Sequence, residues 1–177
     1  SVHDMHSLET IKNSTDNIAA AVKMAQGFAI DRKSQTLSRL CIASKKKKII
    51  LFDFSRGEYT FWKDIALQNV PITMKWHGDS IYLGDKSIYK FINVNSDTQF
   101  EVPIPIKDVS PIIQILPQGH ILLASNEIGV LVDENGNPVA GVVDWTGKDV
   151  VDAGSCYPYL ITLSKSLSSK SGKNKDF

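Results

Sequence analysis

Few residues of this 177-residue sequence combine the type and the spacing that chemistry requires. His3 and His6 are spaced as two ligands of one metal ion can be, but no cysteine or carboxylate cluster accompanies them at ligand spacing. We therefore interpret them as exposed turn residues and predict neither a metal nor another cofactor. The sequence shows no nucleophile elbow and no glycine-rich phosphate loop between a strand and a helix. It predicts a protein that is not an enzyme.

The one dense charge is the run of lysines formed by Lys45, Lys46, Lys47 and Lys48. It falls between two predicted strands, where a solvated hairpin loop is the commoner explanation. The alternative is a contact site for acidic lipid headgroups or for an acidic protein partner. Near an anionic membrane each lysine would contribute about 1 kcal/mol to such a contact. These four residues are the candidate partner or membrane contact.

The composition is that of one ordinary soluble domain, with 42% hydrophobic residues and a net charge of +1. This charge does not favour nucleic-acid binding. No apolar run approaches the roughly 18 to 20 residues that span a bilayer, and no secretory leader opens the sequence, so we expect a cytosolic protein. In that compartment Cys41 and Cys156 should both be reduced and lie in or near the core.

The elements that would position these residues follow a repeat of about 40 residues, which is typical of four-stranded propeller blades. The segment Ile81–Leu83 recurs as Ile121–Leu123, and Phe91–Asn93 recurs as Leu131–Asp133. Ile161 continues the first series. We expect Ile81, Ile121 and Ile161 to face the same inter-blade layer.

Each repeat contains short apolar runs that predict strands, ordered from the innermost to the outermost. The middle runs are almost continuously apolar, as expected for strands covered on both faces. Pro103 and Pro105 place the segment that contains them at a sheet edge, because proline donates no ladder hydrogen bond. The predicted strands are 27–31, 40–44, 48–54 and 59–62, then 72–76, 80–84, 88–93 and 99–106, then 112–116, 120–125, 128–133 and 138–145.

This pattern predicts an all-β fold, a partial β-propeller with about three complete four-stranded blades and parts of two more. Residues 8–11 would form the outer strand of an earlier blade. Residues 12–26 would be an inserted loop or a short helix, because a turn or cap cluster precedes a stretch of helical composition there. Trp76 and Trp145 should pack between blades. Residues 164–177 are mostly serine and lysine and should form a disordered tail after a domain of residues 1–163.

Several segments resemble one known family. Residues 71–84 resemble a blade of the citron homology (CNH) domain found in the vacuolar protein sorting 39 and TGF-beta receptor-associated protein family. Trp145-Thr146, residues 156–163 and residues 2–8 are similar to further structural motifs of that family. The resemblance covers most of residues 1–163, which we therefore identify as a partial CNH β-propeller. The insertion at 12–26 looks longer than the loop of the family.

The resemblance implies a non-enzymatic protein-interaction module of a vesicle-tethering subunit in the HOPS or CORVET complexes, which act in endosome to vacuole or lysosome transport. The implied partners are other tethering-complex subunits, a small GTPase of the Rab class, and the endosomal or vacuolar membrane as a peripheral contact, without nucleic acid. The implied location is cytoplasmic, on the late endosome, vacuole or lysosome membrane. The alternative is the regulatory CNH module of a citron-type kinase or Rho exchange factor. Flanking domains distinguish the two, since a helical solenoid would favour tethering.

Overall fold

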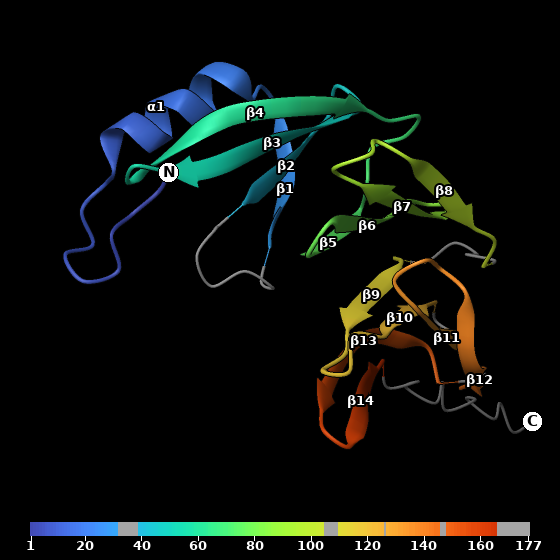
Figure 1. Cartoon of the computed structure of the whole chain (residues 1–177). Helices are drawn as coiled ribbons and strands as arrows, with labels where there is room; N and C mark the ends of the chain where they lie inside the picture. The colour runs from blue at the N-terminus through green and yellow to red at the C-terminus, as the bar shows by residue number, and fades with distance from the viewer. Residues whose placement is uncertain (32–38, 105–109, 126, 146–147, 166–177) are drawn as a thin grey trace, which may run out of the picture.

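The computed structural model of the chain describes residues 1–31, 39–104, 110–125, 127–145 and 148–165. Three antiparallel sheets of four strands and one of two strands follow one another in chain order (Figure 1). The first three sheets contain β1 Ala25–Ile30, β2 Leu40–Ser44, β3 Lys48–Ser55 and β4 Glu58–Ala66; β5 Thr73–His77, β6 Ser80–Gly84, β7 Tyr89–Asn93 and β8 Gln99–Val102; and β9 Ile112–Ile115, β10 Ile121–Ala124, β11 Ile128–Val132 and β12 Pro138–Asp144. The last sheet contains β13 Val150–Cys156 and β14 Tyr159–Ser164.

These sheets are blades arranged side by side around an open arc (Figure 1). The first strand of each sheet contacts the first strand of the next, since β5 touches β1 and β9, and β9 touches β13. Asp31, which follows β1, also forms a parallel bridge with Trp76 in β5. The prediction of an all-β, partial propeller is confirmed. The predicted tail lies outside the described residues from residue 166 onward, as does Thr146.

The core consists of apolar layers between neighbouring blades. Every residue of β2 and of β10 is buried, which explains why these middle strands are apolar along their whole length. Trp76 and Trp145 are both buried, as predicted. The layers join Cys41 and Leu51 to Trp76 and Ile81, Tyr82 and Phe91 to Ile121 and Val132, and Leu122 and Trp145 to Val150 and Leu160.

One buried hydroxyl fastens the second blade to the third. Tyr89 in β7 accepts a hydrogen bond from the backbone N–H of Ile112 at 3.2 Å and donates one to the carbonyl of Ala124. Burial raises the pKa of Tyr89, although these hydrogen bonds act in the opposite direction. The neutral phenol therefore persists at physiological pH, and it satisfies backbone groups of both β9 and β10 from the neighbouring blade.

The expectation for Ile161 is wrong. Ile81 and Ile121 each face the preceding blade, but in β14 that side is taken by Leu160, whereas Ile161 is 58% exposed. The turns before these strands differ in length: His77 pairs with Ser80 and Cys156 with Tyr159, whereas Leu116 of the third blade bonds across to His120. A repeat of 40 residues counted from Ile121 is therefore out of register by one residue in the fourth blade. Because side chains alternate along a strand, a change of one residue moves the whole set to the other face.

The N-terminal segment also differs from its prediction. Residues 8–11 form no strand, and only an isolated bridge joins His3 to Thr10. The inserted segment contains the helix α1, Lys12–Ala21, which packs against β4 and against the outer face of the first blade (Figure 1). The cap cluster lies inside this helix rather than before it, and its Ser14 accepts a hydrogen bond from the N–H of Tyr59. Tertiary contact thus decides the position of the helix.

Only one cysteine matches its prediction. Cys41 is buried, whereas Cys156 at the end of β13 is exposed and lies outside the core, contrary to the expectation. Among the described residues the fourth blade is packed on one face only, so its side chains have less cover. In the described part of the chain, no helix has the length and apolarity needed to cross a membrane.

Candidate interaction face

The predicted lysine site divides into a turn and a strand. Lys45, Lys46 and Lys47 form the turn between β2 and β3 and are exposed; these three residues are called the lysine turn. Lys48 begins β3, where its ammonium group pairs with Asp64 of β4 at 2.6 Å. The lysine turn therefore presents three cations to solvent, while Lys48 contributes to the cross-strand contacts of its own blade.

The main chain of the lysine turn is held on both sides. The N–H of Lys45 donates to the carbonyl of Met24 at 3.0 Å, and the carbonyl of Lys47 accepts from the N–H of Leu67 at 2.8 Å. Lys47 has a positive φ of 57°, which closes the turn. The backbone thus fixes where the lysines emerge, while their long side chains keep their rotamer freedom.

A neighbouring hairpin adds a further cation. The turn between β6 and β7 carries Lys86, which is exposed and lines the same surface hollow as Lys45. Sequence reasoning missed this residue, although it stands one repeat of about 40 residues after Lys46. Among the described residues, no carboxylate forms an ion pair with the lysine turn or with Lys86. The remaining residues lining the hollow are Gln26, Asn69, Val70, Ile72, Asp85 and Ser87.

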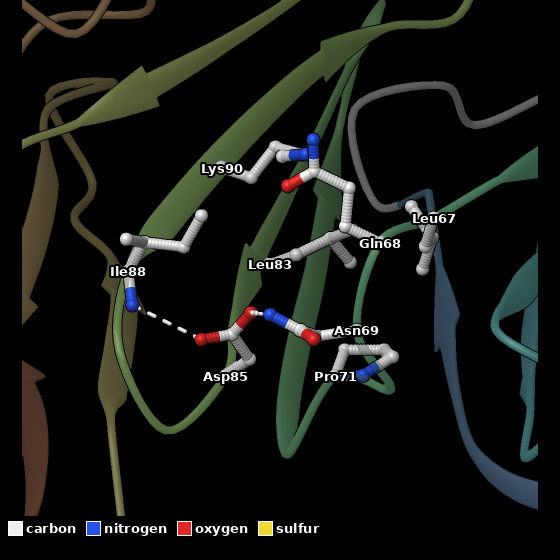
Figure 2. A pocket seen from close by; sticks show the side chains of 8 residues that line it. All are labelled: Leu67, Gln68, Asn69, Pro71, Leu83, Asp85, Ile88 and Lys90. Carbon is white, nitrogen blue, oxygen red and sulfur yellow. Dashed lines mark hydrogen bonds between the residues drawn. The ribbon is translucent and has the colours of Figure 1, made fainter.

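A smaller hollow lies beside it, between the β4–β5 connection and the β6–β7 hairpin (Figure 2). Asp85 organises this hollow: its carboxylate accepts from the side-chain amide of Asn69 at 2.9 Å and from the N–H groups of Ser87 and Ile88 at 2.7 and 3.0 Å. Burial raises the pKa of Asp85, but these hydrogen bonds outweigh it, so the pKa lies below its ordinary value. The ionised carboxylate is engaged within the chain and holds the loop that carries Lys86.

At the opposite end of the first two blades, cationic side chains lie beside carboxylates. There Arg39 lies 3.4 Å from Asp53 and 4.0 Å from Asp79, and Lys63 pairs with Asp97. The contacts with Asp79 and Asp97 join the two blades, and all three carboxylates offset the charges of Arg39 and Lys63. The opposite end keeps one exposed arginine, Arg56 in the β3–β4 turn, whereas four exposed lysines gather on the side of the lysine turn, where an anionic surface would be attracted.

The inner strands offer little chemistry. Their hollow includes His77 and Lys75, and none of its described lining residues is a carboxylate. The described residues contain no group of three His, Cys, Asp or Glu that could hold a metal. His3 lies at the N-terminal bridge and His6 is exposed in a turn. The other lining residues are Phe28, Ala29, Ile30, Met74, Trp76, Gln114, Ile115, Leu116, Pro117 and Ser155.

The sheets pack on one another through apolar faces, and the lysine turn and Lys86 lie in the turns that connect their strands. This arrangement defines a protein of the propeller class, in which loops rather than strand faces are accessible to partners. Comparison with solved structures agrees: the chain is similar to the AfRom2 CNH domain, with a TM-score of 0.59 at 14% identity, covering 79% of this chain and 48% of that one. It is also similar to the Pan2 WD40 domain of Neurospora crassa, with a TM-score of 0.58 at 14% identity, covering 80% and 44%. At such identities the likeness shows the fold.

The family follows from the sequence comparison. Residues 1–167 match the CNH domain family, and the chain belongs to it. The chain is 26% identical over 134 residues to "Vacuolar sorting protein 39" of Arabidopsis thaliana, covering 76% of this chain and 13% of that protein. It is 26% identical over 140 residues to the human "Vam6/Vps39-like protein", covering 76% and 15%. The chain thus spans only a small part of the length of these relatives.

Proposed function

We propose that this chain is the propeller of a vesicle-tethering subunit and acts as a non-enzymatic protein-interaction module in transport from endosomes to the vacuole or lysosome. The observation that carries the proposal is membership of the CNH family together with likeness to proteins named for vacuolar sorting. Its blades use their faces to pack on one another, which leaves turns for partners.

The proposed partners are the other subunits of the tethering complex, a Rab GTPase, and an anionic endosomal or vacuolar membrane reached from the cytoplasm. The face with the lysine turn and Lys86 is the proposed membrane contact. Three exposed lysines on one turn and a fourth on the adjacent blade suit a surface of negative headgroups better than a single small anion.

The tethering function is tested with the intact parent protein, purified with its complex. We expect it to cluster vesicles that carry a late-endosomal Rab GTPase bound to a GTP analogue, with clustering about tenfold weaker for the GDP-bound form. The nucleotide matters because the γ-phosphate orders the switch loops that a partner reads. Light scattering measures clustering. Vesicle clustering that does not depend on the GTPase would contradict the tethering proposal. If the parent protein also carried an upstream kinase or exchange domain, the chain would instead be a regulatory module.

Removing the lysine turn should weaken membrane binding without unfolding the protein. In the intact parent protein, the change of Lys45, Lys46 and Lys47 to serine is expected to lower the affinity for anionic liposomes, measured by sedimentation, about 100-fold at low salt, since each of the three lysines contributes about 1 kcal/mol near such a surface. The difference should shrink as salt is added, because exposed charges are screened beyond about 10 Å at 0.1 M.

The matched control removes the same charge elsewhere. Lys12, Arg56 and Lys75 are exposed and lie outside the lysine turn, and Arg56 has a positive φ of 53°, as Lys47 has 57°. Changing these three residues to serine should leave sedimentation within about twofold of the unaltered protein if position, rather than total charge, decides binding. Equal losses in the two triple variants would contradict a localised membrane contact.

A further inference from the structure

The outer strand of the third blade is unusually open. All seven residues of β12 are exposed, and they include Val139, Val142 and Val143. The strand pairs with β11 on one side, and no described strand pairs with its other side (Figure 1). A side chain built at Gly141 would meet nothing within 4 Å. This edge therefore offers backbone hydrogen-bonding groups and apolar side chains together.

The outer strands of the first two blades are protected. At the edge of β4, the helix α1 supplies Ser14 and Asn17, whose side chains bond the N–H and the carbonyl of Tyr59 at 2.8 and 2.9 Å. In the second blade, β8 has four residues, includes a glutamate, and is followed directly by Pro103. Short edges, charges and prolines discourage pairing with a further strand. Within β12, proline occurs only at its first position and the one charge is Asp144 at its end.

We propose that the outer edge of β12 accepts an extended segment of a protein partner as a fifth strand of the third blade. An extended chain repeats its backbone N–H and C=O groups at the same spacing as a strand edge. The open edge of β12 therefore fits a partner segment in the extended conformation. This inference does not depend on the proposed tethering function, because it rests on the geometry of one sheet.

Charge identifies the chemistry of the segment. Glu134 lies in the turn before β12, Asp144 ends the strand, and Glu127 is held beside that end because its carbonyl accepts from the N–H of Trp145 at 2.9 Å. Carboxylates thus stand at both ends of an uncharged, valine-rich edge, and Lys148, whose N–H donates to the carbonyl of Trp145, lies in the turn beyond its C-terminal end. The complementary segment alternates apolar and small polar residues and carries a cationic residue at its ends. Such a segment differs from the anionic surface expected at the lysine turn.

The test uses the 177-residue chain and a synthetic peptide that alternates valine and threonine between terminal lysines. Hydrogen exchange of the amides of β12 should slow about tenfold when the peptide is bound, because added strand pairing shields them from water. The same peptide with N-methylated valines should give no protection, since it lacks the donors that pairing needs. Val142→Lys should weaken binding of the labelled peptide about tenfold, as a lysine on an edge strand opposes pairing and here also repels the peptide.

The matched control is Ile161→Lys. Ile161 is 58% exposed and Val142 is 60% exposed, so both changes replace an open aliphatic side chain by the same charge, but Ile161 lies in β14 of another sheet. Peptide binding by Ile161→Lys should stay within about twofold of the unaltered chain. Equal weakening in both variants, binding of the N-methylated peptide, or no protection of β12 at saturating peptide would overturn the proposal. Protection that rises with protein concentration without peptide would also overturn it, because a second copy would then occupy the edge.

Discussion

Replacing Ile121 by aspartate is expected to lower the free energy of unfolding of the chain by about 3 to 5 kcal/mol. Ile121 is fully buried in β10 and packs in the layer between the second and third blades. A carboxylate at this place would lose its hydration and meet only apolar neighbours such as Tyr82 and Ile113. Urea unfolding followed by tryptophan fluorescence measures the change.

The control for this substitution is Ile161→Asp. The repeat of the sequence assigns the two isoleucines to one position, but Ile161 lies on the exposed side of β14. Its substitution should therefore change the stability of the 177-residue chain by no more than about 0.5 kcal/mol. A large loss in both variants would mean that Ile161 is also buried, and an unchanged unfolding midpoint for Ile121→Asp would contradict the inter-blade layer itself.

The sequence predicts the strands well because each blade repeats a strong local signal. Runs such as Ile121–Leu123 are apolar without alternation, which is the pattern of a strand covered on both faces. Asp133 and Asn93, at equivalent places in two repeats, each accept backbone N–H groups at the turn into the fourth strand. Local propensity and long-range packing agree at these positions, so the order of strands within a blade follows from the spacing of apolar runs and turns in the repeat.

The register is harder to predict, because it depends on the length of each turn. In the third blade Leu116 bonds across to His120, whereas in the fourth blade Cys156 pairs directly with Tyr159. The turn of the third blade is one residue longer than that of the fourth blade and than that of the second, where His77 pairs with Ser80. A repeat counted from Ile121 therefore selects Ile161 where the structure uses Leu160. Turn length is a small change in sequence, but it inverts a whole strand face.

The lysine run shows a similar limit at the candidate site. The sequence predicts a hairpin loop between two strands, and Lys45 to Lys47 form it. It does not reveal that Lys48 lies beside Asp64, because that contact depends on how β3 is aligned with β4 across a register shift. Lys86 was detectable from the repeat, but its place beside Lys45 requires knowing that successive blades stack with equivalent turns on the same side.

The second large effect is expected for Trp76→Ala, which should lower the free energy of unfolding by about 3 to 5 kcal/mol. Trp76 is 1% exposed and fills the layer between the first two blades, with its indole N–H donating to the carbonyl of Gly78 at 2.8 Å. The N–H of Gly78 in turn donates to the carboxylate of Asp31 at 2.9 Å, across the blade boundary. Truncation would leave a cavity and free the turn that Asp31 holds.

Trp76→Phe separates these two contributions. Phenylalanine keeps much of the apolar volume but cannot donate to Gly78, so its cost should be smaller than that of alanine, at about 1 to 2 kcal/mol. Hydrogen exchange at the Gly78 amide should accelerate in both variants if the indole positions the turn, because the bond from Gly78 to Asp31 depends on that position. Equal stability of the phenylalanine and alanine variants would show that the indole hydrogen bond to the β5–β6 turn, rather than the filled layer, accounts for the stabilisation by Trp76.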